Sequence, residues 1–224
     1  MNSIEEKRAG GQRGFSLVEF FVSILLTSIM LSAIYSVYRV QTHSVKLQEN
    51  RLEAQEYARS TLDLMVREIR NAGYAPTGAT CAGILIATTQ TLQFFLDANG
   101  DGDCSDADEN ITYAYVALTK DISRTSITGG SAQILTDGNA TKLQLIYYPQ
   151  QTGATPPPPY CYVTAGDLVV NGVTCSGIVT ANLGNIQRIT VSLTVQSKNP
   201  DAEFGGQLNA TMTSNADLRN RGLP

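Results

Sequence analysis

The chain has 224 residues, a formal net charge of −4, a single histidine and a hydrophobic content of 42%. This length allows one or two domains. The slight excess of acidic over basic residues gives no basic face for nucleic acid, so we expect no nucleic-acid partner.

A polar segment at the start of the chain leads into a long apolar run. Gly14 to Tyr38 contains no Lys or Arg and a single acidic residue, Glu19. Such a run can cross a bilayer as one helix, which takes about 20 residues. Basic residues precede the run and none follows it until Arg39. By the positive-inside bias, we expect the residues before the run in the cytoplasm and everything after Tyr38 exported.

Glu19 is the unusual residue of this run. A carboxylate at this depth costs a few kcal/mol if it faces lipid unpaired. No cation of the same helix is near enough to pair with it. Cleavage after Gly14 would make Phe15 an N-terminus, whose amine would supply a positive charge. We therefore expect Glu19 to pair with such an amine on another copy or another subunit.

The segment from Arg13 to Glu19, RGFSLVE, resembles the class III signal of type IV pilins and type II secretion pseudopilins. The order of its parts is specific: a basic leader, a glycine, a phenylalanine, one glutamate and an apolar run. The resemblance implies that a prepilin peptidase removes residues 1–14, cutting between Gly14 and Phe15, and methylates the new amine. An ordinary signal anchor or signal peptide is the alternative, although no good small-residue cleavage site follows the run.

One long helix is expected from Phe15 to about Asn71, because this segment contains no proline and no glycine. Residues 15–38 form its transmembrane and assembly half, and residues 39–73 its amphipathic half. Apolar residues of the second half recur at helical spacing, so they form one stripe that needs a sheet to cover it. The stripe consists of Leu47, Ala54, Ala58, Leu62, Met65 and Ile69.

The end of this helix narrows the resemblance to the minor subunits of these families. The run from Tyr57 to Tyr74 is similar to the helix end of PilW-type minor pilins and GspJ-type minor pseudopilins. Major pilins commonly carry a proline within the membrane half, and this chain has none there.

Two local contacts are expected near the end of the helix. Asp63 and Arg67 are expected to form an ion pair across one turn, and Gly73 is expected to cap the helix.

Residues 74–224 are predicted to form a β-rich head. Alternating or β-branched runs bounded by turns predict its strands. These runs are residues 91–96, 111–118, 142–148, 186–195 and 207–213. Residues 74–89 and 120–139 are expected to be mainly loop, with a short strand at 133–136. Together with the helix, these runs predict an α+β, pilin-like fold in which the long helix packs on an antiparallel sheet.

The loop after the first predicted strand, DANGDGDCSDAD, matches the pattern of a calcium loop. Oxygen-bearing side chains alternate along it, and calcium takes six to eight oxygen ligands. We predict a structural Ca²⁺ ion. Its ligands would be the side chains of Asp97, Asn99, Asp101 and Asp108, the carbonyl of Asp103, and Ser105 through a water. Whether Asp108 or Glu109 completes the loop is open, and a solvated acidic turn is the alternative.

The four cysteines all lie in the part that is predicted to be exported: Cys81, Cys104, Cys161 and Cys175. Disulfides persist in oxidising compartments, and four cysteines permit three connectivities. Proximity in sequence favours Cys81–Cys104 and Cys161–Cys175. No pair has C-x-x-C spacing, so disulfide-stapled loops are expected rather than a zinc or redox site. The second pair would close a stiff, exposed loop that contains Pro156 to Pro159.

The sequence shows no constellation of residues typical of an enzyme. Phosphate loops, nucleophile elbows and H-E-x-x-H motifs are absent. The one histidine, His43, is expected to be a surface residue rather than a base. We therefore expect no catalytic activity.

The resemblance implies a function in assembly, as a minor pilin of PilW type that enters or primes a type IV pilus, the fimbrium used in twitching motility. The chain would cross the inner membrane of a Gram-negative bacterium once, with its C-terminus in the periplasm, and then join a surface filament. Its partners would be other pilins and minor pilins, the prepilin peptidase, the assembly platform and the lipid bilayer. A GspJ-like minor pseudopilin and a pilus-borne module for cell adhesion are the alternatives.

Overall fold

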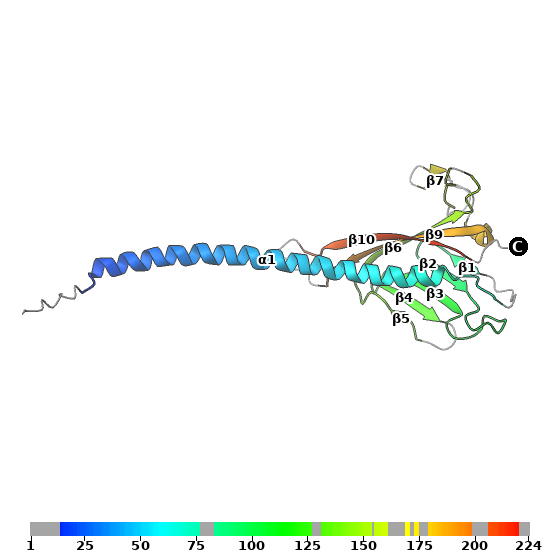
Figure 1. Ribbon diagram of the computed structural model, residues 1–224, viewed down its shortest axis with the longest axis horizontal. Helices are drawn as coiled ribbons and strands as arrows, with labels where there is room; N and C mark the ends of the chain where they lie inside the picture. Colours follow the sequence, from blue (N-terminus) through cyan, green and yellow to red (C-terminus); the bar gives the residue numbers. More distant parts are fainter. Residues whose placement is uncertain are drawn as a thin grey trace, which may run out of the picture. The chain divides into compact units, whose positions relative to one another are not determined.

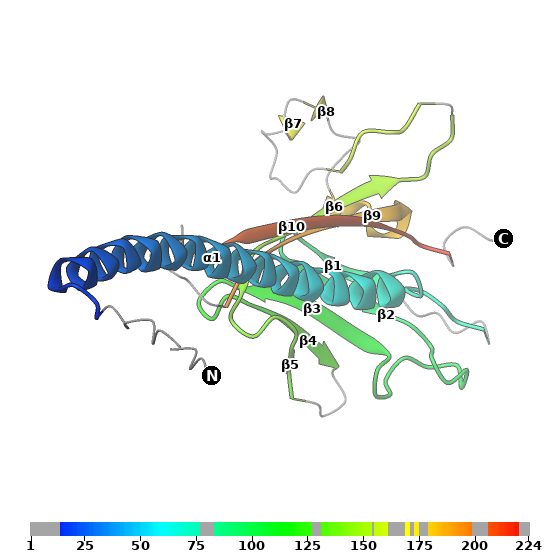
Figure 2. The same ribbon diagram turned by 60° about the vertical axis from the view of Figure 1, so that its left-hand side comes forward.

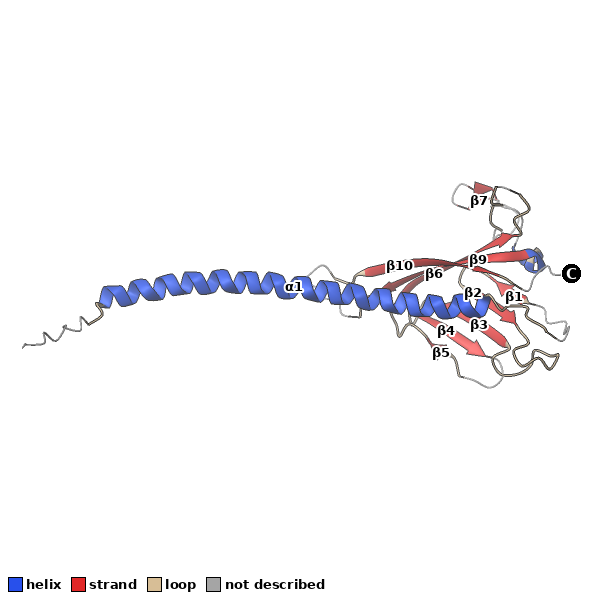
Figure 3. Ribbon diagram, in the orientation of Figure 1, coloured by secondary structure: helices blue, strands red, loops and turns tan. Residues whose placement is uncertain are grey.

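The computed structural model describes residues 14–76, 83–126, 131–153, 155–160, 169–170, 173–174, 179–198 and 206–219. In these ranges one long helix is followed by antiparallel strands, which confirms the predicted α+β arrangement (Figure 1, Figure 3). The chain divides into two compact units, Met1–Leu47 and Gln48–Pro224. The boundary falls inside the helix, within the predicted amphipathic half rather than at the predicted division after Tyr38.

The helix α1 runs without interruption over Leu17–Ile69. It begins and ends two residues inside the predicted bounds, and residues 70–73 form a turn. Gly73 has the left-handed φ of 76° that a glycine adopts without steric cost. Its N–H donates to the carbonyl of Phe95 at 2.7 Å. The turn at the helix end is therefore tied directly to the first sheet.

The unit Met1–Leu47 contains the apolar half of α1. Its large apolar side chains are exposed from Phe15 through Val45, with none of them in a core. In the part of the chain that the structure describes, α1 is the one helix long and apolar enough to cross a membrane. This finding is consistent with a single membrane anchor.

The unit Gln48–Pro224 contains two main sheets, whereas we predicted one. The larger is a five-stranded antiparallel meander in chain order: β1 (Ile84–Ala87), β2 (Thr91–Phe95), β3 (Asn110–Val116), β4 (Asp121–Ser126) and β5 (Gln133–Ile134). The smaller has the order β10-β9-β6: β10 (Asn209–Asp217), β9 (Ile186–Gln196) and β6 (Ala140–Pro149). Shorter elements are β7 (Val169–Val170), β8 (Val173–Thr174), η1 (Val179–Ala181) and η2 (Leu183–Asn185).

The second half of α1 packs between the two sheets, with one sheet on either side of it. In Figures 1 and 2, β10 lies on one side of its cyan part and β3 to β5 lie on the other. The predicted stripe is confirmed from Ala54 onward, because Ala54, Ala58, Leu62, Met65 and Ile69 are buried, whereas Leu47 at its start is only half-buried. Alternate residues of the predicted strands β9 and β6 are buried with it: Ile189, Val191, Leu193 and Val195, then Leu143, Leu145 and Tyr147. One hydrophobic core therefore joins the helix to both sheets.

Two strands occur where we predicted loops. β1 forms at the short apolar stretch 84–87, and β4 forms from the polar sequence DISRTS. In β4 only Ile122 is a large buried apolar residue. The strand exists because its backbone pairs with β3 from Asp121 to Ser126. Pairing with a neighbouring strand therefore outweighs the weak strand preference of this polar sequence.

The predicted disulfides fall mostly outside the described residues. Cys81, Cys161 and Cys175 all lie there. Cys104 is described, and it is not a free thiol. The pairing of the four cysteines therefore stays a prediction.

Candidate functional site

The acidic loop, residues 97–109, connects β2 to β3. Its two end residues, Asp97 and Glu109, are completely buried although both are acids. The Asp97 N–H donates to the carbonyl of Tyr74 at 2.7 Å, and the Leu96 N–H donates to the carbonyl of Glu109 at 2.9 Å. These bonds hold the ends of the loop next to the turn that follows α1.

The buried carboxylates organise the backbone between them. Asp97 Oδ1 accepts from Gly100 N–H at 2.6 Å, and Oδ2 accepts from Gly102 N–H at 3.2 Å. Both glycines have positive φ, so the chain can turn tightly around this carboxylate. Glu109 accepts from the N–H of Ala98 at 3.0 Å and from the N–H of Asp106 at 3.2 Å.

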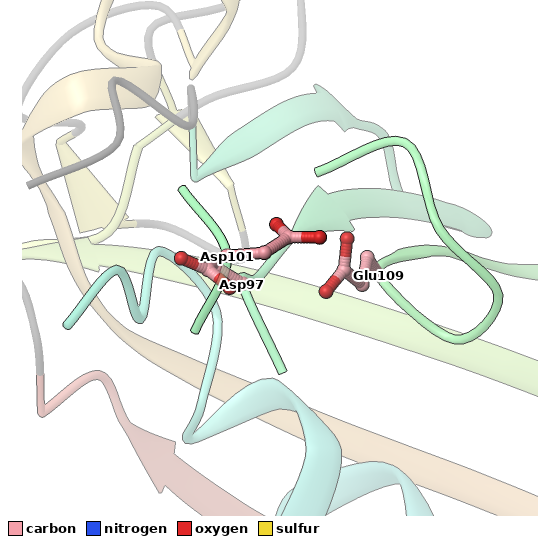
Figure 4. A group of neighbouring side chains, drawn as sticks. All are labelled: Asp97, Asp101 and Glu109. Carbon is pink, nitrogen blue, oxygen red and sulfur yellow. The ribbon is translucent and has the colours of Figure 1, made fainter. Parts of the chain in front are cut away.

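Three carboxylates of the loop meet at one point. An oxygen from each of Asp97, Asp101 and Glu109 lies within 4.8 Å of the other two (Figure 4). Carboxylate oxygens are hard ligands that suit Ca²⁺ or Mg²⁺, and each retains lone pairs beside the N–H that it accepts. The donor set therefore fits a divalent cation, although these three residues alone do not select calcium.

The pKa values of neighbouring acids reflect this crowding. The pKa of Asp106 is raised, first by desolvation and then by the negative charges of Asp101, Glu109 and Asp103. The pKa of Asp101 is lowered, mainly because its carboxylate accepts the N–H of Asp103 and then the Asn99 side chain. A cation at this point would relieve the repulsion that Asp106 experiences.

The remaining predicted ligands make other contacts. The Asn99 amide nitrogen donates to Asp101 at 2.9 Å and to Asp106 at 2.8 Å. Asp103 Oδ1 accepts from the N–H and the hydroxyl of Ser105. Asp108, at φ 67°, forms an ion pair with Arg124 at 2.9 Å. Glu109 therefore lies with the cluster and Asp108 faces Arg124, but which one would ligate an ion stays a prediction.

A largely buried charge network adjoins the loop, and the sequence did not predict it. Arg124 Nε on β4 donates to both oxygens of Glu68 on α1, at 3.1 and 3.0 Å. The Tyr113 hydroxyl on β3 donates a short hydrogen bond to the same carboxylate. Burial and this bond raise the pKa of Tyr113. Burial disfavours the charge of Arg124, but Glu68 and Asp108 together raise its pKa. The network joins the helix, the sheet and the acidic loop.

The predicted processing site lies just ahead of α1. Gly14 to Ser16 are not helical, and Phe15 is exposed. Glu19 lies in the first turn of α1, where a negative charge is favourable against the helix dipole. Within the described ranges Glu19 forms no ion pair, and its side chain is exposed. The carboxylate of Glu19 is therefore exposed on the first turn of α1.

Hydroxyl groups in the apolar half of α1 bond to the helix itself. They donate to the carbonyls three or four residues earlier, at 2.7 to 2.9 Å: Ser23, Thr27, Ser28, Ser36 and Thr42. Such bonds satisfy a hydroxyl in apolar surroundings without a partner. Ser28, Ile29, Ser32, Ala33 and Ser36 also line a shallow groove of about 530 Å³. All of these except Ile29 are small, and small residues let two membrane helices approach closely.

No family model, no curated protein and no solved structure matches this chain. The resemblance drawn from the segment Arg13–Glu19 therefore stays a hypothesis that is carried by the motif itself.

Proposed function

We propose that this chain is a pilin-like filament subunit of the PilW minor-pilin type, held in the inner membrane by α1 before assembly. One observation carries the proposal. The Gly14–Phe15 bond lies in exposed, non-helical backbone directly ahead of a helix whose apolar part contains Glu19 as its only acid. A peptidase at the cytoplasmic face would reach this bond without unwinding the helix.

Cleavage would provide Glu19, which is unfavourable in lipid, with a specific partner. Glu19 is costly in lipid while it is unpaired, and the new amine of Phe15 on a neighbouring subunit would neutralise it. The exposed apolar half of α1 would exchange lipid for neighbouring helices in the filament, and its small-residue groove would allow close approach. Assembly would then depend on proteolysis, since only proteolysis creates the amine.

The head would need no partner to keep its structure, because it has its own core. We include a structural Ca²⁺ ion in the proposal. Asp97, Asp101 and Glu109 would hold it, and it would supply positive charge to a loop that is otherwise crowded with acids. The ion would stiffen the connection between β2 and β3.

Mass spectrometry of the intact mature protein tests the processing step. We expect a chain that begins at Phe15 and carries one added methyl group. Full-length chains, still beginning at Met1, in working filaments would overturn the proposal.

The role of Glu19 is tested by Glu19→Ala, with Glu49→Ala on the same helix as the matched control. Glu19→Ala should leave membrane insertion and cleavage largely intact and strongly reduce incorporation into filaments, because the new amine would lose its partner. The control should assemble normally. Normal assembly by Glu19→Ala would argue against the charge pair.

The phenotype of a deletion distinguishes the pilus from type II secretion. Loss of surface pili and twitching supports a minor pilin. Loss of protein export with pili intact would instead identify a pseudopilin.

A further inference from the structure

A groove of about 380 Å³ lies between the last two turns of α1 and the edge strand β10. We call it the arginine groove. Its lining residues are Asp63, Val66, Arg67, Arg70, Asn71, Ser214 and Arg219. Asp63, Val66 and Arg67 lie on α1, and Arg70 and Asn71 follow in the turn after it. These five residues recur at spacings of three and four, so they lie on one side of the helix end, toward β10.

Positive charge in the arginine groove is not balanced. The predicted pair of Asp63 with Arg67 is wrong, because Asp63 instead faces Arg59, one turn earlier, at 3.9 Å. Within the described part of the chain, Arg67 and Arg219 form no ion pair. The Arg70 side chain donates to the carbonyl of Asn215, at 3.4 Å, and takes part in none of the ion pairs of the described residues.

The helix dipole explains only part of this charge. It favours a cation in the last turn of a helix, which accounts for Arg67. It does not account for Arg219, which follows β10 and is brought to the helix end by the bond from its N–H to the carbonyl of Arg70. In a chain of net charge −4, three converging arginines are a local exception.

The acidic loop lies at the same end of α1. Its anchor at Tyr74 follows the last helical turn, and its ion pair with Arg124 joins it to β4. The arginine groove lies on the β10 side of the helix, whereas β3 and β4 lie on the other side (Figure 2). At this end of α1 the head thus presents positive charge in the arginine groove on the β10 side and negative charge in the acidic loop on the side of β3 and β4.

We propose that the arginine groove binds the acidic loop of a second copy of this chain, side by side in the filament. The inference rests on the proposed function, which aligns the helices of neighbouring subunits in parallel. Between parallel copies a contact joins two different surfaces, so groove and loop can meet without two-fold symmetry. Asp103 and Asp106 are exposed and lie outside the three-carboxylate cluster. Each accepts hydrogen bonds within the loop, Asp103 from Ser105 and Asp106 from Asn99, and an ionised carboxylate can accept further bonds from an arginine beside them. Guanidinium groups bind carboxylates in bidentate geometry.

Charge reversal in the full-length chain, in cells that make the filament, tests the contact. Arg67→Glu with Arg219→Glu should lower the amount of chain in filaments at least about tenfold, because like charges then face each other. Asp103→Lys with Asp106→Lys should have the same effect. All four substitutions in one chain should restore incorporation to within about twofold of wild type. Lys120→Glu with Lys142→Glu, an equal charge change at exposed positions elsewhere, should assemble normally.

Zero-length crosslinking identifies the partner directly. Arg67→Lys keeps the charge and introduces an amine that a carbodiimide couples to a touching carboxylate. In filaments built from a mixture of ¹⁴N- and ¹⁵N-labelled copies, we expect a mixed-isotope crosslink from position 67 to Asp103 or Asp106. A crosslink to a different protein, or one only within a single copy, would overturn the inference.

Processing and membrane content of each variant separate misfolding from lost contact, since the charge-reversed chains should be cleaved and retained like wild type. If wild type is processed and assembled and the double arginine variant assembles equally well, the contact is wrong and the proposed function stands. If wild type is never cleaved after Gly14, the proposed function fails first. Failure of the quadruple variant to recover also counts against the contact.

Discussion

The two halves of α1 belong to one uninterrupted helix but meet opposite surroundings. Before Leu47 the large apolar side chains are exposed, whereas after Gln48 an apolar stripe is buried against two sheets. Burial of apolar area supplies most of the stability of a fold. The second half therefore contributes to the stability of the head, and the first half carries apolar surface that the described residues leave exposed.

Polar groups differ between the halves in the same way. Hydroxyls of the first half bond to carbonyls of their own helix, as Ser23 and Ser36 do. In the second half the hydroxyl of Ser60 also bonds to its own helix, but Glu68 bonds to Tyr113 and Arg124 on two strands. A self-satisfied polar group suits a helix whose neighbours change, whereas a tertiary network suits one fixed packing arrangement. The bonds of Glu68 therefore fix the second half of α1 against the head.

Met65→Ala should cause the largest loss of head stability. Met65 is fully buried in the core, so we expect its truncation to lower the free energy of unfolding by about 2–5 kcal/mol. Leu31→Ala in the exposed half is the matched control, and it should leave unfolding of the head unchanged. Urea unfolding of the full-length protein in detergent measures both. Equal effects would contradict the division of roles between the halves.

Glu68→Gln should have the next largest effect. The substitution keeps the shape but removes the charge that Arg124 and Tyr113 bind, at a cost of about 1.5–3 kcal/mol. Glu56→Gln, an exposed position on the same helix, is the control and should be nearly neutral. Urea unfolding again gives the difference. A neutral Glu68→Gln would mean that the network contributes nothing to the attachment of α1.

Strong periodicity predicted most of the head, and weak periodicity explains what was missed. The stripe ending at Ile69 and the alternation of β9 follow from apolar spacing alone. β4 contains one large buried side chain, Ile122, so its sequence carries little pattern. The division into two sheets depends on which strands pair across long separations, as β6 does with β9. Local sequence does not contain that information.

The acidic loop was predictable as a cluster but not in its details. Its alternating acids place Asp97 and Asp101 together, as the pattern indicates. Choosing between Asp108 and Glu109 requires Arg124, which lies on a strand that the sequence did not predict. A single arginine in a short polar run gives no signal of that contact.

Removal of calcium should have an intermediate effect on the head. If Ca²⁺ is bound at saturating concentration, chelation should lower the melting temperature of the full-length protein by roughly 5–10 °C. Asp101→Asn should abolish the response, whereas Asp108→Asn should keep it, because Asp108 is paired with Arg124. The same loss in both variants would favour Asp108 as a ligand. No response of the wild type would leave the loop as a solvated turn.

Alkaline pH should weaken the same head by a smaller, graded amount. Burial and the bond to Glu68 raise the pKa of Tyr113 above its ordinary value of 10.0. Below that value both folded and unfolded chains keep the proton, so this contribution is fully present. Above it the unfolded chain releases the proton first, and stability falls by about 1.4 kcal/mol for each pH unit. Tyr113→Phe should flatten this decline in unfolding measured from pH 9 to 11. An identical decline in the variant would assign it to other groups.

The smallest effect is expected in the exposed half, at Ser36. Its side chain is exposed and its hydroxyl donates to the carbonyl of Ala33 on the same helix, so Ser36→Ala should change head stability by less than about 0.5 kcal/mol. Membrane insertion should also be unchanged, because an alanine is at least as apolar. Ser36→Leu provides the sharper comparison, since a large side chain would fill the small-residue groove. It should reduce incorporation into filaments while urea unfolding of the head stays at the wild-type value. A lowered unfolding free energy in Ser36→Leu would show that the exposed half also supports the head, and the contrast between the two halves would fail.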